Sequence, residues 1–327
     1  MGNIKERDFS IDVLKFLAVF LIINSHMDIL YTNYKFLATG GAIGDTLFLF
    51  CSGYTLLLNK QNIRFDNWYK RRINRIYPSV IVCALMGALF RMQSDINITT
   101  FCGGGFVSAI MVYYILIYFI RVHAVNRIPL ILAGVLFVSL LIYILFFPYK
   151  NETGENGLYG IKTIYRWIPY FAFMLMGAFI GIKRKNLVYK PIIDFIKMFI
   201  CLFLFYGIQF AAKKDIRIAP YQIVTLLPLM GIVFYFYKWC NAGFWGKIYK
   251  HRICHDIIMT ISGLCLESYL IQFSVFTTSM NNIFPFNLPI MIIIVLLAAF
   301  ICKCLSRIFI QTFKDTDYNW KDVIKLY

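Results

Sequence analysis

The stretch KFLAVFLIINSH, from Lys15 to His26, decides the fold because it closes an apolar run with an ionisable side chain at each end. Similar runs recur along the 327-residue chain, in which 60% of the residues are hydrophobic. Runs of about 20 apolar residues fit membrane-spanning helices, whereas the strands of an outer-membrane barrel would alternate apolar and polar residues. The sequence therefore predicts an all-α integral membrane protein. We expect one polytopic domain over residues 1–327 and no separate soluble domain.

The connecting segments predict how the helices are threaded through the bilayer. Nearly three times as many lysines and arginines lie in alternate segments on one side as in those on the other. Positive residues favour the cytoplasmic side, so the net charge of +17 is explained by topology and not by a nucleic-acid partner. We expect about ten spans with both termini in the cytoplasm. The predicted spans are 13–31, 41–58, 77–92, 104–120, 128–148, 167–182, 191–211, 220–237, 258–278 and 287–305. Pro228 lies inside a predicted span and predicts a kink there.

The first predicted helix carries a polar stripe. Lys15 and His26 are eleven residues apart, which places them about 20° from helical register and about 16 Å apart along the axis. Asp12 lies close to the same stripe. Charged side chains inside a membrane are costly, so they usually face the protein interior or a wet cavity. The structural alternatives are a lysine that reaches the headgroups and a histidine that bonds two helices.

The second predicted helix offers a partner for the histidine. Asp45 lies near the outer end of the span, at the depth expected for His26 on the preceding antiparallel helix. A carboxylate there would fix the imidazole tautomer and raise its basicity. The alternative is that Asp45 faces water in the outer loop. Glycines at 40, 41, 44 and 53 would allow this helical hairpin to pack closely.

A basic cluster precedes the third predicted span. The segment NWYKRRINRIYP (67–78) contains Arg71, Arg72 and Arg75. Arg72 and Arg75 are three residues apart and share a helical face, and guanidinium groups bind phosphate oxygens with two hydrogen bonds. The segment therefore predicts a site for a cytoplasmic donor with several phosphates. The alternative is ordinary positive charge near anionic lipid.

The cysteines and histidines predict no metal centre. The nine cysteines are an odd number and lie mostly in apolar spans, where they behave as small buried hydrophobes and not as disulfide partners. The segment HRICH (251–255) has suitable ligand types but no matching second pair of ligands.

These motifs together resemble the membrane acyltransferase-3 family, which includes bacterial O-acetyltransferases that modify surface glycans. The Lys15-x10-His26 spacing is similar to that family's basic-x10-His motif. The resemblance also rests on four further segments: GDTLFLFCSGY (44–54), RINRIYP (72–78), YFAFMLMGAFIG (170–181) and SGLCLESYLIQ (262–272). In order and spacing they cover most of the chain.

The sequence departs from the family pattern at three places. Gln272 stands where many members have a histidine, so we assign it no acid–base role. The aromatic segment often found in the fourth span is only loosely matched by VYYILIY (112–118). We expect no additional esterase-like domain after the last span.

The resemblance implies transfer of an acetyl group from cytoplasmic acetyl-CoA to a hydroxyl of a cell-surface polysaccharide or lipid-linked sugar, in the inner membrane of a bacterium. Lys15 would lie along the path of the donor, whose phosphates Arg71, Arg72 and Arg75 would bind. His26 would act as general base or carry the acyl group. Asp45 or Glu267 would orient His26, although Glu267 could equally form a structural ion pair. The expected partners are the donor, the sugar acceptor and the bilayer, and a homodimer is compatible with this function.

A transporter or flippase for a glycan or lipid precursor is the main alternative. It would also carry charges inside the membrane, but it would more often show inverted repeats with broken spans at matching positions. Pro228 and the segment CGGGF (102–106) are the breaks that the sequence offers, and they do not correspond. A non-catalytic scaffold is a third alternative, and it gives no reason for the register of Lys15 and His26.

Overall fold

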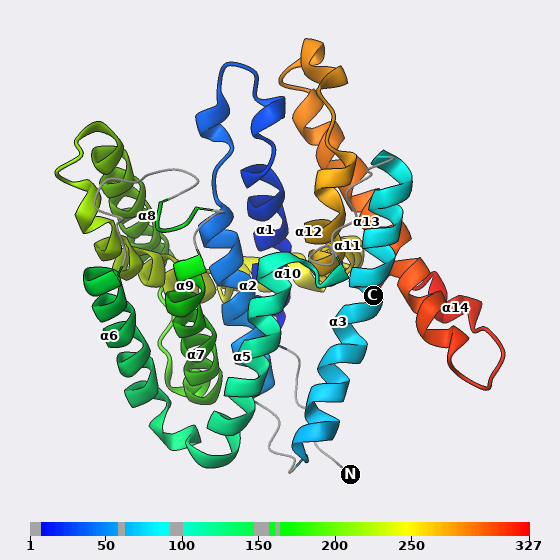
Figure 1. Ribbon diagram of the computed structural model, residues 1–327, viewed down its shortest axis with the longest axis horizontal. Coiled ribbons are helices and arrows are strands. Elements are labelled where there is room, and N and C mark those ends of the chain that lie inside the picture. The colour runs from blue at the N-terminus through cyan, green and yellow to red at the C-terminus, as the bar shows by residue number, and fades with distance from the viewer. Residues whose placement is uncertain (1–7, 58–62, 92–100, 147–156, 161–163) are drawn as a thin grey trace. The chain divides into compact units, whose positions relative to one another are not determined.

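The computed structural model describes residues 8–57, 63–91, 101–146, 157–160 and 164–327, and within these ranges every regular element is a helix (Figure 1). The described residues form two compact units whose segments alternate along the chain. Unit 1 comprises Met1–Leu14, Asp45–Gln61 and Phe119–Lys247, and unit 2 comprises Lys15–Gly44, Asn62–Tyr118 and Ile248–Tyr327. Four of their five boundaries fall inside helices, namely α1 (Phe9–Ser25), α2 (Gly41–Leu56), α5 (Gly104–His123) and α10 (Gly243–Lys250).

Seven helical segments of the described chain are long and apolar enough to cross a membrane. They are Lys35–Leu56, Gly104–His123, Val125–Phe146, Ile164–Asn186, Pro191–Lys214, Ala219–Cys240 and Asn287–Thr312, and a bent pair of shorter helices would make an eighth. The prediction of a polytopic all-α membrane protein is therefore confirmed. The count of ten spans and the cytoplasmic location of the termini stay predictions.

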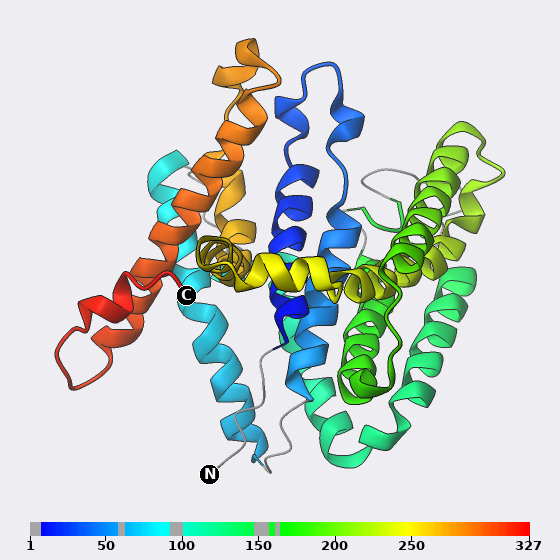
Figure 2. The ribbon, with the colours of Figure 1, turned by 180° about the vertical axis from the view of Figure 1, so that it is seen from behind.

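Unit 1 is built around α7 (Trp167–Lys183), whose residues from Pro169 to Ala178 are all buried. The helices α6 (Ile128–Phe146) and α8 (Pro191–Lys214) instead expose large apolar side chains, such as Phe137 at 61% and Phe203 at 77%. Helix α8 runs beside α9 (Leu226–Cys240) in both views (Figures 1 and 2). The Lys238 ammonium of α9 contacts the buried Asp194 carboxylate of α8 at 2.6 Å. Apolar faces of this size on α6 and α8 are typical of contact with lipid.

Two glycines bring the backbones of α2 and α7 into contact within unit 1. A Cβ atom on Gly53 would lie 1.8 Å from the Met174 carbonyl oxygen, and one on Gly177 would lie 2.0 Å from the Phe50 carbonyl oxygen. No side chain fits at either position without moving a helix. Small residues allow this close approach between membrane helices.

Unit 2 packs α3 (Phe65–Arg91), α12 (Cys265–Val275) and α13 (Asn287–Thr312) against one another. Their shared core consists of Val82, Cys83, Leu264, Ile271, Ala299 and Cys302. Figure 2 shows α13 with the short α14 (Trp320–Val323) folded back at its end. The unit also contains α11 (Arg252–Gly263) and most of α1.

Short 3-10 helices connect these elements. They are η1 (Asp28–Leu30), η2 (Lys35–Leu37), η3 (Val125–Arg127), η5 (Ile164–Arg166), η6 (Arg184–Asn186), η7 (Ala219–Thr225) and η8 (Thr278–Ile283).

Several predicted helices differ from the structure. The helix predicted at 13–31 runs from Phe9 to Ser25, and the one predicted at 287–305 continues to Thr312. The span predicted at 258–278 is divided into α11 and α12, which are bent by 69° at a break after Gly263. Pro228 does not kink a span, because it lies in the first turn of α9, where its missing N–H costs little. The helix predicted at 77–92 begins at Phe65, because Trp68 is buried and its indole N–H donates to the Tyr114 carbonyl of α5 at 3.3 Å.

The predicted close packing after the first helix is confirmed for three glycines. Cβ atoms at Gly41 and Gly44 would come within 2.9 Å of Ser25 and 2.5 Å of Ile22, and one at Gly40 would meet Leu21 at 3.1 Å. Gly40 also has a φ of 105°, which L side chains rarely adopt. Gly53 instead allows the close contact between α2 and α7.

Candidate functional site

Helix α1 carries the basic residue and ends at the histidine. Lys15 is half-buried and forms no ion pair with any residue that the structure describes. His26 follows the last helical residue, and its backbone N–H donates to the Ile23 carbonyl at 3.1 Å. This tightened turn changes the rotation of one residue by about 20°, so Lys15 and His26 stay on nearly the same face.

His26 is held against α12 by a ring contact. Its imidazole is half-buried and lies 4.8 Å from the Phe273 ring, centroid to centroid, at 59°. The segment after His26 is fixed by two side-chain amides: Asn281 donates to the Ile29 carbonyl at 2.9 Å, and Asn287 donates to the Leu30 carbonyl at 3.0 Å. The imidazole therefore has a defined position within unit 2.

Asn24 is a residue that the sequence reasoning missed. Its side-chain amide donates to the carbonyls of Leu37 and Thr39, both at 2.9 Å, and its oxygen accepts from the Tyr31 hydroxyl. These bonds close the loop that contains His26. A polar residue two positions before a histidine in an apolar helix was the signal that could have identified it.

Glu267 occupies the first turn of α12 and is 3% exposed. Its carboxylate accepts from the Ser79 hydroxyl of α3 at 2.8 Å and lies 3.3 Å from the Lys303 ammonium of α13. Lys303 also donates to the Gly263 carbonyl at 2.6 Å. The carboxylate thus joins the three packed helices of unit 2. Ser79 and Lys303 are partners that the sequence alone did not identify.

The orientation of α12 separates Glu267 from the histidine. Glu267 and Phe273 are six residues apart, so their side chains point about 120° apart and lie about 9 Å apart along the axis. Glu267 faces α3 and α13, while Phe273 meets His26.

The basic cluster lies on the first three turns of α3. Arg71 and Arg75 are exposed, and Arg72 is half-buried. The Arg72 guanidinium lies over the Trp68 ring at 4.6 Å and over the Tyr114 ring at 5.7 Å. Stacking holds the plane of this group, and a planar guanidinium with a fixed orientation suits recognition of phosphate.

Asp45 belongs to unit 1 and is half-buried in the second turn of α2. It interacts electrostatically with Arg166, a residue that the sequence reasoning did not single out. The Arg166 guanidinium stacks on the Trp167 ring at 4.3 Å and donates to the Tyr159 carbonyl at 3.3 Å. The predicted pairing of Asp45 with His26 joins the two units and stays a prediction.

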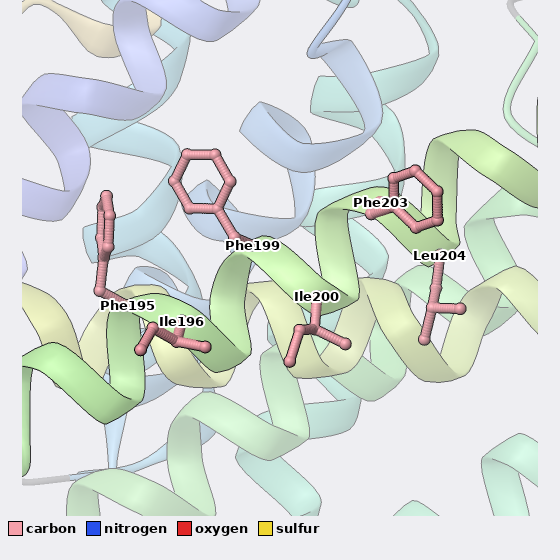
Figure 3. Close-up of a pocket in the computed structure, with 6 residues that line it drawn as sticks. All are labelled: Phe195, Ile196, Phe199, Ile200, Phe203 and Leu204. Atoms are coloured by element: carbon pink, nitrogen blue, oxygen red, sulfur yellow. The ribbon is translucent and has the colours of Figure 1, made fainter.

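A shallow groove of about 470 Å³ lies on α8 (Figure 3). The side chains that line it are all apolar: Phe195, Ile196, Phe199, Ile200, Phe203 and Leu204. It offers no polar group for catalysis and fits a lipid-facing surface. No group of three potential metal ligands occurs among the residues that the structure describes.

Comparison with known proteins identifies the family. A family model described as an acyltransferase domain matches residues 8–307, which is nearly the whole chain. No curated protein and no solved structure matches the chain. The match includes α1, the basic cluster of α3 and α12. The chain therefore belongs to the membrane acyltransferase-3 family.

Proposed function

We propose that this membrane acyltransferase moves an acetyl group from cytoplasmic acetyl-CoA to a hydroxyl of a cell-surface polysaccharide or lipid-linked sugar, in the inner membrane of a bacterium. The observation that carries the proposal is the half-buried His26 at the end of the helix that carries Lys15, in a chain of this family. An imidazole can take a proton near neutral pH, which activation of a hydroxyl requires.

The donor's phosphates would bind at the basic cluster of α3. Arg71 and Arg75 are exposed and would meet the donor's phosphates directly, and Arg72 is held beside them by aromatic rings. Lys15, which has no ion-pair partner in the described chain, would lie farther along the path of the donor arm. These residues fit a ligand with several phosphates and a long uncharged arm.

His26 would act on the acceptor. In direct transfer, an imidazole nitrogen takes the hydroxyl proton while the sugar oxygen attacks the thioester carbonyl. The carbon–sulfur bond breaks, and the proton passes from the imidazolium to the leaving thiolate. In the covalent alternative, the imidazole nitrogen attacks the thioester first, the carbon–sulfur bond breaks and the thiol leaves with the proton of the ring. The sugar hydroxyl then attacks the acetyl-imidazole, and its proton returns to the ring.

The carboxylate that we propose for orienting His26 is Asp45. The oxygens of Glu267 are already engaged by Ser79 and Lys303. For Glu267 we propose an indirect role, which is to hold α12 in place so that Phe273 positions the imidazole.

The experiment is mass spectrometry of O-acyl groups on the surface glycans of the source cell. Three strains are compared: the intact gene, a deletion, and His26→Ala at matched membrane abundance. Loss of acylation in both altered strains supports the proposal and identifies the acceptor. If the deletion loses acylation and His26→Ala keeps it, the role of His26 is wrong. If neither strain loses acylation and the deletion changes glycan export, a transporter replaces the proposal.

A further inference from the structure

Two buried polar side chains of α12 have atoms with no partner. The Ser268 hydroxyl oxygen and the Gln272 amide oxygen are shielded from solvent and form no hydrogen bond within the described chain. Their residues are 1% and 0% exposed. Buried polar atoms are almost always paired, so two orphans on one helix require an explanation.

The two residues form a strip along one face of α12. They are four positions apart, so their side chains point the same way and lie about 6 Å apart along the axis. The Gln272 amide nitrogen donates to the Tyr269 carbonyl at 3.2 Å, which fixes the side chain and leaves its oxygen as a free acceptor.

The strip reaches the histidine. Gln272 precedes Phe273, whose ring contacts the imidazole of His26. One residue of helix rises by about 1.5 Å, so Gln272, at the C-terminal end of the strip, lies at nearly the same level along the α12 axis as the Phe273 ring. A ligand bound along the strip would deliver its end to the neighbourhood of His26.

The spacing and polarity of the strip fit an amide-bearing chain. The residues beside it on α12 include the buried Cys265 and Ile271, which suit methylene groups. The arm of coenzyme A, pantetheine, carries two amides in an otherwise aliphatic chain. These amides are about 5 Å apart, since the unit between them is one carbon longer than a peptide residue of ~3.6 Å. A sugar acceptor would instead present several hydroxyls and need more polar partners than this face offers.

We propose that Ser268 and Gln272 bind the pantetheine amides of the acyl donor, Gln272 as acceptor for one N–H and Ser268 as partner for the other amide. This inference rests on the proposed function, because that function supplies the donor. It makes Gln272 a binding residue without any acid–base role.

The test compares donors with and without amides in the purified protein. Gln272→Met and Ser268→Ala are assayed with acetyl-CoA, S-acetylpantetheine and a short acetyl thioester that lacks amides. Losing one neutral hydrogen bond of about 1 kcal/mol should raise KM about fivefold for the first two donors. KM for the amide-free thioester should not change. Ser268→Thr, which keeps the hydroxyl, should restore the wild-type KM.

The matched control is Ser306→Ala on α13. It also removes a buried hydroxyl, but that hydroxyl already donates to the Cys302 carbonyl at 2.7 Å. This variant should leave KM unchanged for all three donors. Gln272→Met removes the hydrogen bond to the Tyr269 carbonyl together with the unpaired buried oxygen, so the unfolding temperature of the free protein should change little, whereas the rise that added pantetheine produces should be reduced.

The outcomes separate the two proposals. An equal loss of kcat/KM with all three donors would show that the strip is purely structural and would overturn the inference. Unchanged kinetics with every donor would also overturn it, and this is the result expected if a buried water occupies the strip. Calorimetry with pantetheine adds an assay without turnover. If pantetheine binds to the wild type and Gln272→Met weakens this binding about fivefold, but no thioester supports transfer, the strip stands and the proposed function fails. If the wild type binds no pantetheine, the strip fails even where transfer occurs.

Discussion

At the scale of single residues, Lys15 lies on α1, His26 lies on the turn that ends this helix, and the buried carboxylate of Glu267 joins three helices of unit 2. The spacing of Lys15 and His26 depends only on helical periodicity, and the structure keeps both on α1 and its last turn. Glu267 was recognisable as a costly charge. Its partner Lys303 lies 36 positions away, and no local pattern links the two. Long-range pairs of this kind depend on which helices pack together, and that is decided by the whole core.

The ion pair of Glu267 and Lys303 leads to a stability prediction. Lys303→Met leaves a buried carboxylate with Ser79 as its remaining hydrogen-bond partner, so unfolding free energy should fall by about 3 kcal/mol. The double variant Glu267→Gln with Lys303→Met removes both charges and should recover most of that loss. Thermal unfolding of the detergent-solubilised variants measures both effects.

Acyl transfer should be assayed about 10 °C below the unfolding temperature of the least stable variant, so that every protein compared is folded and a loss of activity reflects chemistry. The double variant should retain acyl transfer with an unchanged pH profile. If the activity losses of Glu267→Gln and Lys303→Met add up in the double variant, or if its pH profile is shifted, Glu267 takes part in the proton transfer.

At the scale of helices, the sequence predicted where apolar segments lie but misplaced several ends. Hydropathy identifies α6, α8 and α13 because they expose apolar faces along their length. Hydropathy predicted α11 and α12 as one span, because both helices are apolar and no change in composition marks the bend after Gly263. It also began α3 too late, because the charged turns of that helix are held by the aromatic contacts of Trp68, which depend on another helix.

The contact between α2 and α7 gives the prediction for this scale. In Gly177→Ala the new methyl would meet the Phe50 carbonyl oxygen at 2.0 Å, so the helices must separate. The unfolding free energy should fall by about 3 kcal/mol or more, the upper end for an overpacked core. Gly207→Ala on α8 is the control, since its Cβ meets nothing within 4 Å. It should be neutral or slightly stabilising in the same thermal measurement, because alanine favours helices. Equal effects of the two substitutions would show that this contact is not tight.

At the scale of the whole molecule, charge and hydropathy together predicted a polytopic membrane protein, and the structure confirms that class. The sequence could not reveal that the described chain forms two interleaved units, because each unit depends on contacts between distant segments. The residues that we predicted for the site are distributed over both units. His26, Glu267 and the arginines of α3 belong to unit 2, whereas Asp45 belongs to unit 1.

The distribution of positive charge predicts the topology. Reporter fusions after Leu187, in the connection that carries Lys185, should give fluorescent green fluorescent protein and inactive alkaline phosphatase, because we place this connection in the cytoplasm. Fusions after Asn282, in η8, should show the opposite. Both outcomes are read in whole cells. The same reporter active at both positions would mean that the predicted number of intervening spans has the wrong parity.

The interleaving of the units has a consequence for biosynthesis. Helix α2 leaves the ribosome about 120 residues before α7, the helix on which its glycine packs. At a typical rate of about 5–20 residues per second, that face waits roughly 6–24 seconds in the membrane for its partner. Unit 2 cannot close until α13 has been made, although it contains most of α1. Unit 1 has all its segments once the chain has been made as far as Lys247, so it can be complete while unit 2 still waits for its last helices.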